Sequence, residues 1–141
     1  MPEALVDELV KIDLFADLPP KHLKSIATHV QTRSVREGLE IVREGAYSGD
    51  FFVIFSGSAE VTVRGKHRMT VGPGEFFGEV AILGHTQSST VKALEHMELG
   101  VIDAKEFFAL LESEPKVTVH LAQALILRLE ELTVRPAGQL A

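Results

Sequence analysis

The sequence predicts an α+β fold, in which a double-stranded antiparallel β-roll, jelly-roll-like, is flanked by N-terminal helices and two C-terminal helices. Apolar residues recur at helical spacing before residue 32 and again after residue 103. Between these limits, short runs of β-branched and aromatic residues recur about every eight to twelve positions, separated by glycines. A chain of 141 residues is one domain by size. We therefore expect one domain over 1–141, with helices at 1–31, the roll at 32–103 and helices at 104–134.

The N-terminal region predicts two helices. Apolar side chains recur at helical spacing over residues 3–12. Pro19 and Pro20 then separate this segment from a second amphipathic helix, because proline is tolerated in the first turn of a helix. The second helix is expected to end near His29.

The central region predicts seven strands. Residues 51–55 are apolar throughout, so both faces of this strand should be buried, and we expect it to form the core of the roll. Residues 59–63 alternate between apolar and polar, as in a strand with one solvated face. The seven predicted strands are 32–35, 40–43, 51–55, 59–63, 68–71, 89–93 and 98–102.

Helical periodicity returns after the last strand. Asp103 is a suitable N-cap for a helix over 104–111, and Glu106 would complete a capping box. Pro115 begins a longer helix that should run to about Val134, with a frayed tail beyond it. Apolar residues cover more than one face of this last helix, whereas a surface helix shows a single stripe. Either the helix packs deep in its own domain, or its second apolar flank meets its twin in a homodimer, which we favour.

The most unusual stretch is 72–92, where three glycines precede a short apolar run opened by Glu79. We expect a tight turn and one turn of helix whose N–H groups, near residues 78–81, form a small anion pocket. An ordinary corner between two strands is the alternative. The glycine spacing matches neither the dinucleotide-binding fingerprint nor the P-loop. A carboxylate at position 79 needs donors, which neighbouring N–H groups or ligand hydroxyls could supply.

Composition argues against several functions. The chain has no cysteine, its six histidines show no metal-site spacing, and no serine lies in a nucleophile elbow, so we expect no catalytic residues, no metal and no cofactor. A net charge of −6 without a basic cluster argues against nucleic-acid binding. No signal peptide and no apolar run of membrane-spanning length is visible, so we expect a cytoplasmic protein that does not bind membranes.

The order of the turn motifs resembles that of the cyclic nucleotide-binding domain family, which includes catabolite-activator-type regulators, kinase regulatory subunits and gated channels. The resemblance extends over roughly residues 14–132. Its most specific part is the segment Gly-Glu-Phe-Phe-Gly-Glu-Val-Ala at 74–81. The other matching motifs are Glu37-Gly38, Glu44-Gly45, Gly49-Asp50 and Ser56-Gly57.

The resemblance implies that residues 74–91 form a phosphate-binding cassette. In the family, the acid at the position of Glu79 accepts a hydrogen bond from the ribose 2′-OH, and backbone N–H groups beside it line the sugar and phosphate. A lid from the last helix covers the base. The ligand-binding candidates are therefore Phe77, Gly78, Glu79, Val80, Ala81, Gln87, Ser88 and Ser89, and the lid candidates are Leu125, Leu129 and Leu132.

The sequence departs from the family at the arginine that neutralises the cyclic phosphate, because Gln87 occupies its position. No arginine or lysine lies between Arg68 and Lys92. Loss of such a charge-assisted contact costs about 2–5 kcal/mol. Gln87, Ser88 and Ser89 can still donate neutral hydrogen bonds.

Three hypotheses follow. The first is a sensor module that binds a cyclic nucleotide, cAMP rather than cGMP, without an output domain of its own and without DNA binding. The second is a dimerisation or protein-interaction module that has lost the ligand. The third keeps the pocket for a different, uncharged ligand, consistent with Gln87. In each case the chain is either free-standing or a fragment of a longer protein.

Overall fold

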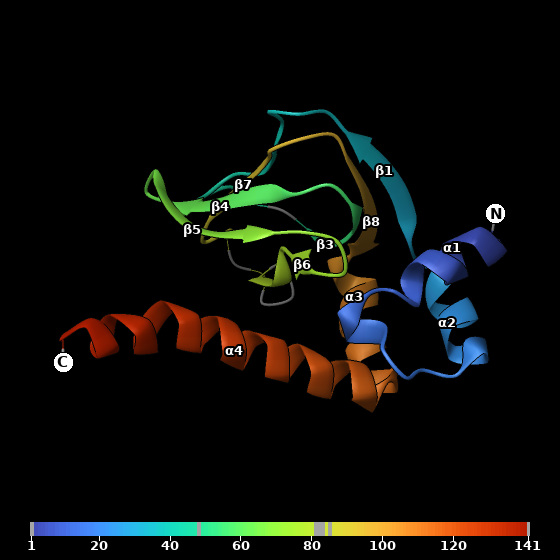
Figure 1. Cartoon of the computed structure of the whole chain (residues 1–141). Helices are drawn as coiled ribbons and strands as arrows, with labels where there is room; N and C mark the ends of the chain where they lie inside the picture. Colours follow the sequence, from blue (N-terminus) through green and yellow to red (C-terminus); the bar gives the residue numbers. More distant parts are fainter. Residues whose placement is uncertain (1, 48, 81–83, 85, 141) are drawn as a thin grey trace.

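The computed structural model describes residues 2–47, 49–80, 84 and 86–140, with side chains over residues 4–130. Two four-stranded antiparallel sheets face each other, as Figure 1 shows, and helices gather at one end of them. The first sheet has the order β1 (Gln31–Val35), β8 (Met97–Asp103), β3 (Asp50–Ser56) and β6 (Phe76–Phe77). The second has the order β2 (Glu40–Val42), β7 (Thr90–Ala93), β4 (Ala59–Val63) and β5 (Lys66–Val71). The predicted β-roll flanked by helices is confirmed.

The helices pack against the outer face of the first sheet, the face turned away from the second sheet. In chain order they are α1 (Pro2–Leu9), the 3₁₀-helix η1 (Asp13–Phe15), α2 (Pro20–Ala27), α3 (Ala104–Ser113) and α4 (Pro115–Leu140). Helix α4 starts beside α1, α2 and α3, which we call the helical cluster, and runs beneath the roll and past β6. Its end lies on the far side of the molecule (Figure 1). This course brings the last helix to the segment that follows β6.

Strand β3 is buried on both faces, as its apolar sequence predicts. Phe51 and Val53 belong to a core shared with the helices. Phe52 and Ile54 point the other way, into a core between the two sheets. Because successive side chains of a strand point to opposite faces, this one strand joins the two hydrophobic cores.

Strand β6 is too short to have been predicted from periodicity. Its two residues pair with β3, Phe76 opposite Val53 and Phe77 opposite Phe52. Phe77 also stacks on Phe52, with ring centroids 4.8 Å apart. The pairing attaches the beginning of the predicted cassette directly to the core strand.

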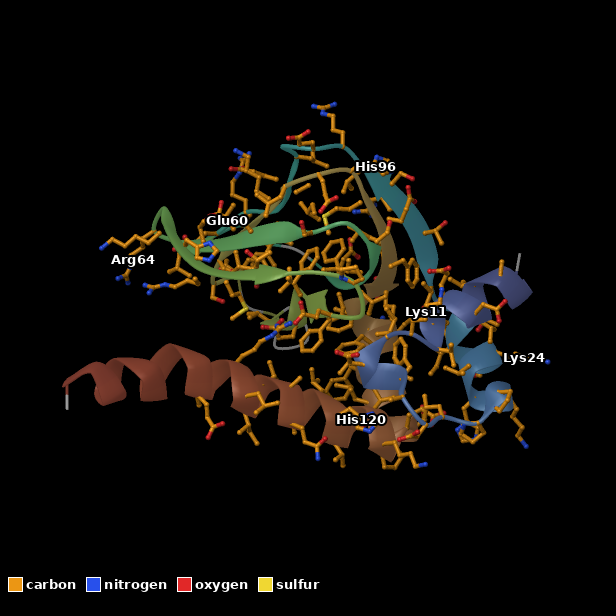
Figure 2. The ribbon with its side chains drawn as sticks, viewed as in Figure 1. Lys11, Lys24, Glu60, Arg64, His96 and His120 are labelled. Atoms are coloured by element: carbon orange, nitrogen blue, oxygen red, sulfur yellow. The ribbon has the colours of Figure 1, made fainter. Side chains whose placement is uncertain are left out.

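Polar contacts join the N-terminal helices to the C-terminal ones. His22 of α2 lies 2.9 Å from Glu114, and His29 lies 3.0 Å from Glu106 of α3. His120 of α4, labelled in Figure 2, donates from Nδ1 to the carbonyl oxygen of Leu14 in η1 at 3.0 Å. These contacts bridge helices that are far apart in sequence.

Two details of the C-terminal helices differ from the sequence predictions. Asp103 does cap α3 by accepting from the Lys105 N–H at 2.8 Å, but the Glu106 carboxylate pairs with His29 instead of completing a capping box. The last helix was expected to end near Val134 with a frayed tail, whereas α4 extends to Leu140. Pro136 lacks an N–H and removes one backbone hydrogen bond, but here it does not end the helix.

The stacking of Phe107 on Phe51 yields a stability prediction. Phe107 is fully buried and its ring centroid lies 3.8 Å from that of Phe51. Phe107→Ala should lower the free energy of unfolding by about 3–5 kcal/mol, because it leaves a cavity between α3 and β3. Urea denaturation followed by circular dichroism measures the change.

The neighbouring Phe108 provides the control, since its side chain is 52% exposed. Phe108→Ala should change the free energy of unfolding by less than about 0.5 kcal/mol. Equal effects of the two substitutions would contradict the assignment of Phe107 to the core.

Candidate functional site

The site begins at a tight turn after β6. Gly78 has a φ of +85°, in the left-handed region that favours glycine. A Cβ atom there would lie 2.9 Å from the Asp50 carbonyl oxygen and 3.1 Å from the Phe52 ring, so only glycine fits against β3. Glu79 and Val80 then have 3₁₀-helical conformation, and the rest of the predicted helical turn lies outside the described residues. The fold thus directs Glu79 away from the core strand.

A cavity of about 270 Å³ opens beside this turn. Three parts of the chain line it: the cassette, the strands β4 and β5, and α4. Its volume lies just below the range of about 300–1,000 Å³ typical of small-molecule sites. The cavity means that the protein's own side chains do not fill the cup formed by the cassette.

Most of the predicted site residues meet at this cavity. Ala81 lies outside the described residues, and so does the side chain of Leu132. The predicted residues that line the cavity are Phe77, Gly78, Glu79, Val80, Gln87, Ser88, Ser89, Leu125 and Leu129.

Glu79 lies at the wall of the cavity and faces a cation from α4. Its side chain is 27% exposed, and its Oε1 lies 3.6 Å from Nη1 of Arg128. The two side chains form an ion pair, but the distance between these atoms is longer than that of a hydrogen bond. The Glu79 carboxylate therefore keeps acceptor capacity for a ligand.

Arg128 is a cavity residue that the sequence analysis missed. Its Nη2 donates to the carbonyl oxygen of Phe76 at 2.6 Å, and its guanidinium carbon lies 4.0 Å from the centroid of the Phe76 ring. These contacts attach α4 to β6 through one side chain. A single arginine between the apolar residues 124–127 and Leu129 was the available signal, since a charge on an otherwise apolar helix face needs a partner.

Gln87 is held firmly at the opposite side of the cassette. Its N–H donates to the carbonyl oxygen of Ala46 at 2.9 Å, and its carbonyl oxygen accepts from the Gly45 N–H at 2.8 Å. The Tyr47 hydroxyl also donates to the carbonyl oxygen of Gly84 at 2.7 Å. The loop between β2 and β3 thus fixes the position of the cassette's second half.

The side-chain amide of Gln87 has unused donors. Only 4% of the residue is exposed, and Nε2 is, over the described residues, the one buried side-chain nitrogen or oxygen without a hydrogen-bond partner. Buried polar groups are normally hydrogen-bonded, so an unpaired amide in the wall of a cavity calls for an explanation. A ligand acceptor in the cavity would provide one.

A larger groove of about 770 Å³ lies elsewhere, between α1, α2 and the first sheet. Two carboxylates, Glu8 and Glu98, line it with one lysine, Lys24. Hydrogen bonds from Ser34 and then from His96 lower the pKa of Glu98, so this carboxylate stays ionised at neutral pH. An excess of negative charge makes this groove a poor site for an anionic ligand.

The part of the chain that the structure describes contains no group of three or more metal-ligating side chains. Within the same residues, no helix combines the length and the apolar character that crossing a bilayer requires.

Comparison with known families matches residues 32–114 to the model described as "Cyclic nucleotide-binding domain". Among curated proteins, the chain is 29% identical over 120 residues to a putative potassium channel protein of Rhodopseudomonas palustris, covering 82% of this chain and 29% of that protein. It is 31% identical over 111 residues to a cAMP-dependent protein kinase regulatory subunit of Schizosaccharomyces pombe, covering 77% and 26%. The chain thus spans less than a third of the length of these two relatives.

Solved structures share the fold. The catabolite activator protein of Thermus thermophilus superposes with a TM-score of 0.77 at 27% identity, over 89% of this chain and 62% of that chain.

The unpaired amide of Gln87 yields a stability prediction. Gln87→Leu should raise the free energy of unfolding of the ligand-free protein by about 1–3 kcal/mol, because it removes a buried donor that has no partner. Urea denaturation without added ligand measures the change.

Gln123→Leu on the exposed side of α4 is the control, with an expected change below about 0.5 kcal/mol. A clear loss of stability in Gln87→Leu alone would mean that the amide is partnered in the free protein.

Proposed function

Since the chain belongs to the cyclic nucleotide-binding domain family, we propose that the cavity between the cassette and α4 binds a cyclic nucleotide, cAMP in preference to cGMP. The name of the Schizosaccharomyces pombe relative, a cAMP-dependent regulatory subunit, supports cAMP. The role that follows is regulatory and not catalytic: a ligand sensor. We place this sensor in the cytoplasm, in keeping with a sequence that has no cysteine.

The position of Glu79 carries this proposal. Gly78 aims the carboxylate into the cavity wall, and the 3.6 Å separation from Arg128 leaves its oxygens able to accept further hydrogen bonds. An ionised carboxylate only accepts, so it recognises hydroxyl groups such as those of a ribose. Ser88 and Ser89 add hydroxyls to the same cavity, suited to a polar ligand.

Helix α4 offers a route from the ligand to the rest of the protein. Leu125, Arg128 and Leu129 line the cavity from this helix, and His120 of the same helix contacts η1. A ligand that contacts α4 more favourably in one position than in another shifts the population toward that position. Ligand binding in the cavity would then shift the position of α4 relative to the helical cluster, and with it any surface that α4 forms.

We also propose that the outer face of α4 forms a homodimer. Val119 and Ile126 are 52% and 59% exposed, and Ala122 is exposed between them. Val119, Ala122 and Ile126 are separated by three and then four residues, the alternating spacing of a coiled-coil seam. Val119 and Ile126 are β-branched residues at the same seam position, a pattern that favours two strands, so the occupant of this face is the same helix of a second copy.

Isothermal titration of the full chain with cAMP and cGMP tests the sensor function. Glu79→Gln should weaken binding of cAMP by about 10- to 150-fold, because a neutral amide replaces a charged acceptor. Glu130→Gln, on the exposed face of α4, should leave the affinity unchanged. Silence toward both nucleotides at millimolar concentration would sink the proposal.

Size-exclusion chromatography with light scattering tests the dimer. The unaltered chain should show twice its mass of 15.4 kDa, and Ile126→Glu should show the monomer mass, because it buries a charge in the seam. Leu127→Glu is the control, since Leu127 is 61% exposed and lies off the seam. A monomer mass for the unaltered chain would contradict the dimer.

A further inference from the structure

Two arginines contribute positive charge to the described lining of the cassette cavity. Arg68 reaches it from β5 and is an exposed residue. Arg128 reaches it from α4, and its side chain is only 19% exposed. An arginine that is largely removed from water interacts more strongly with a nearby anion than an exposed one does. Arg128 is therefore the stronger source of countercharge.

The contacts of Arg128 orient its guanidinium but do not use all of its N–H donors. One N–H bond goes to the Phe76 carbonyl oxygen at 2.6 Å, and the Phe76 ring packs against the plane at 4.0 Å. Glu79 lies at 3.6 Å, outside hydrogen-bond range. A guanidinium carries five N–H donors in a planar fork, so this one keeps donors for a ligand.

Gln87 supplies a neutral hydrogen-bond donor, which complements the charge of Arg128. The residue lines the same cavity, its buried amide nitrogen has no hydrogen-bond partner, and its backbone is hydrogen-bonded to Gly45 and Ala46. A neutral amide donates to a phosphate oxygen but cannot balance its charge. Arg128 can balance the charge, so the two side chains together meet both requirements of an anionic group.

We propose that Gln87 of the cassette and Arg128 of α4 together hold the phosphate of the bound cyclic nucleotide, so that its countercharge comes from the closing helix and not from the cassette. This inference rests on the proposed function. It turns α4 into part of the anion site: the phosphate competes with Glu79 for the guanidinium, and tight binding requires α4 to be in place. Binding of the phosphate charge and positioning of α4 against the cavity are thereby coupled.

The test compares cAMP with adenosine, which lacks the phosphate, by isothermal titration against the full chain. Arg128→Gln should weaken cAMP binding by about 30-fold or more, and should change adenosine binding by less than about threefold. Arg36→Gln, a matched control at an exposed arginine outside the cavity lining, should change both by less than about threefold. Gln87→Leu should weaken cAMP binding by about tenfold with little effect on adenosine.

A double mutant separates charge compensation from simple damage. With Gln87→Arg the cassette carries its own cation, so adding Arg128→Gln should now cost less than about fivefold in cAMP affinity. Circular dichroism and the urea midpoint of each variant show that it is folded.

The outcomes distinguish the two proposals. Equal weakening of cAMP and adenosine by Arg128→Gln overturns the inference, because Arg128 then holds the base or the ribose. Unchanged cAMP binding in Arg128→Gln overturns it as well, while the sensor function stands. An unaltered chain that binds neither cyclic nucleotide removes the sensor function and this inference together.

Discussion

The site depends on the close approach of the Gly78 turn to strand β3. A side chain at position 78 would collide with the Asp50 carbonyl oxygen and the Phe52 ring, so the turn can lie against the core strand only with glycine there. The two-residue pairing of β6 with β3 holds the turn in place. Because β3 is buried on both faces, the position of Glu79 is determined by a strand that belongs to both hydrophobic cores.

The same segment is the point at which α4 reaches the roll. The carbonyl oxygen and the ring of Phe76 receive the Arg128 side chain, and Glu79 follows three residues later. One arginine thus links the helix that lines the cavity to the strand that begins the cassette. The contacts of Arg128 attach α4 to the roll, so a change in these contacts changes the attachment of the helix. A sensor needs a contact of this kind, with two alternative states.

Gln87 shows the cost of keeping such a site. A buried amide nitrogen without a partner destabilises the ligand-free protein, whereas a leucine of similar size would not. The presence of such a group in the wall of the cavity is consistent with the rule that locally unfavourable features, such as buried polar groups without partners, occur at functional sites.

The sequence by itself determined the roll, most of its strand positions and most of the residues that line the cavity. Turn glycines and alternating runs act locally, and the segment at 74–81 matches a family motif, so neighbouring residues were enough to predict Gly78, Glu79 and the cassette around them. Strand β6 was missed because two residues are too few to show a periodicity. The end of α4 was placed too early because the tail was expected to fray. Only the tertiary structure decided that Arg128 lies at the cavity. Fifty-two residues separate it from its hydrogen-bond partner Phe76, and no local pattern encodes which side chain a long helix brings to a distant turn.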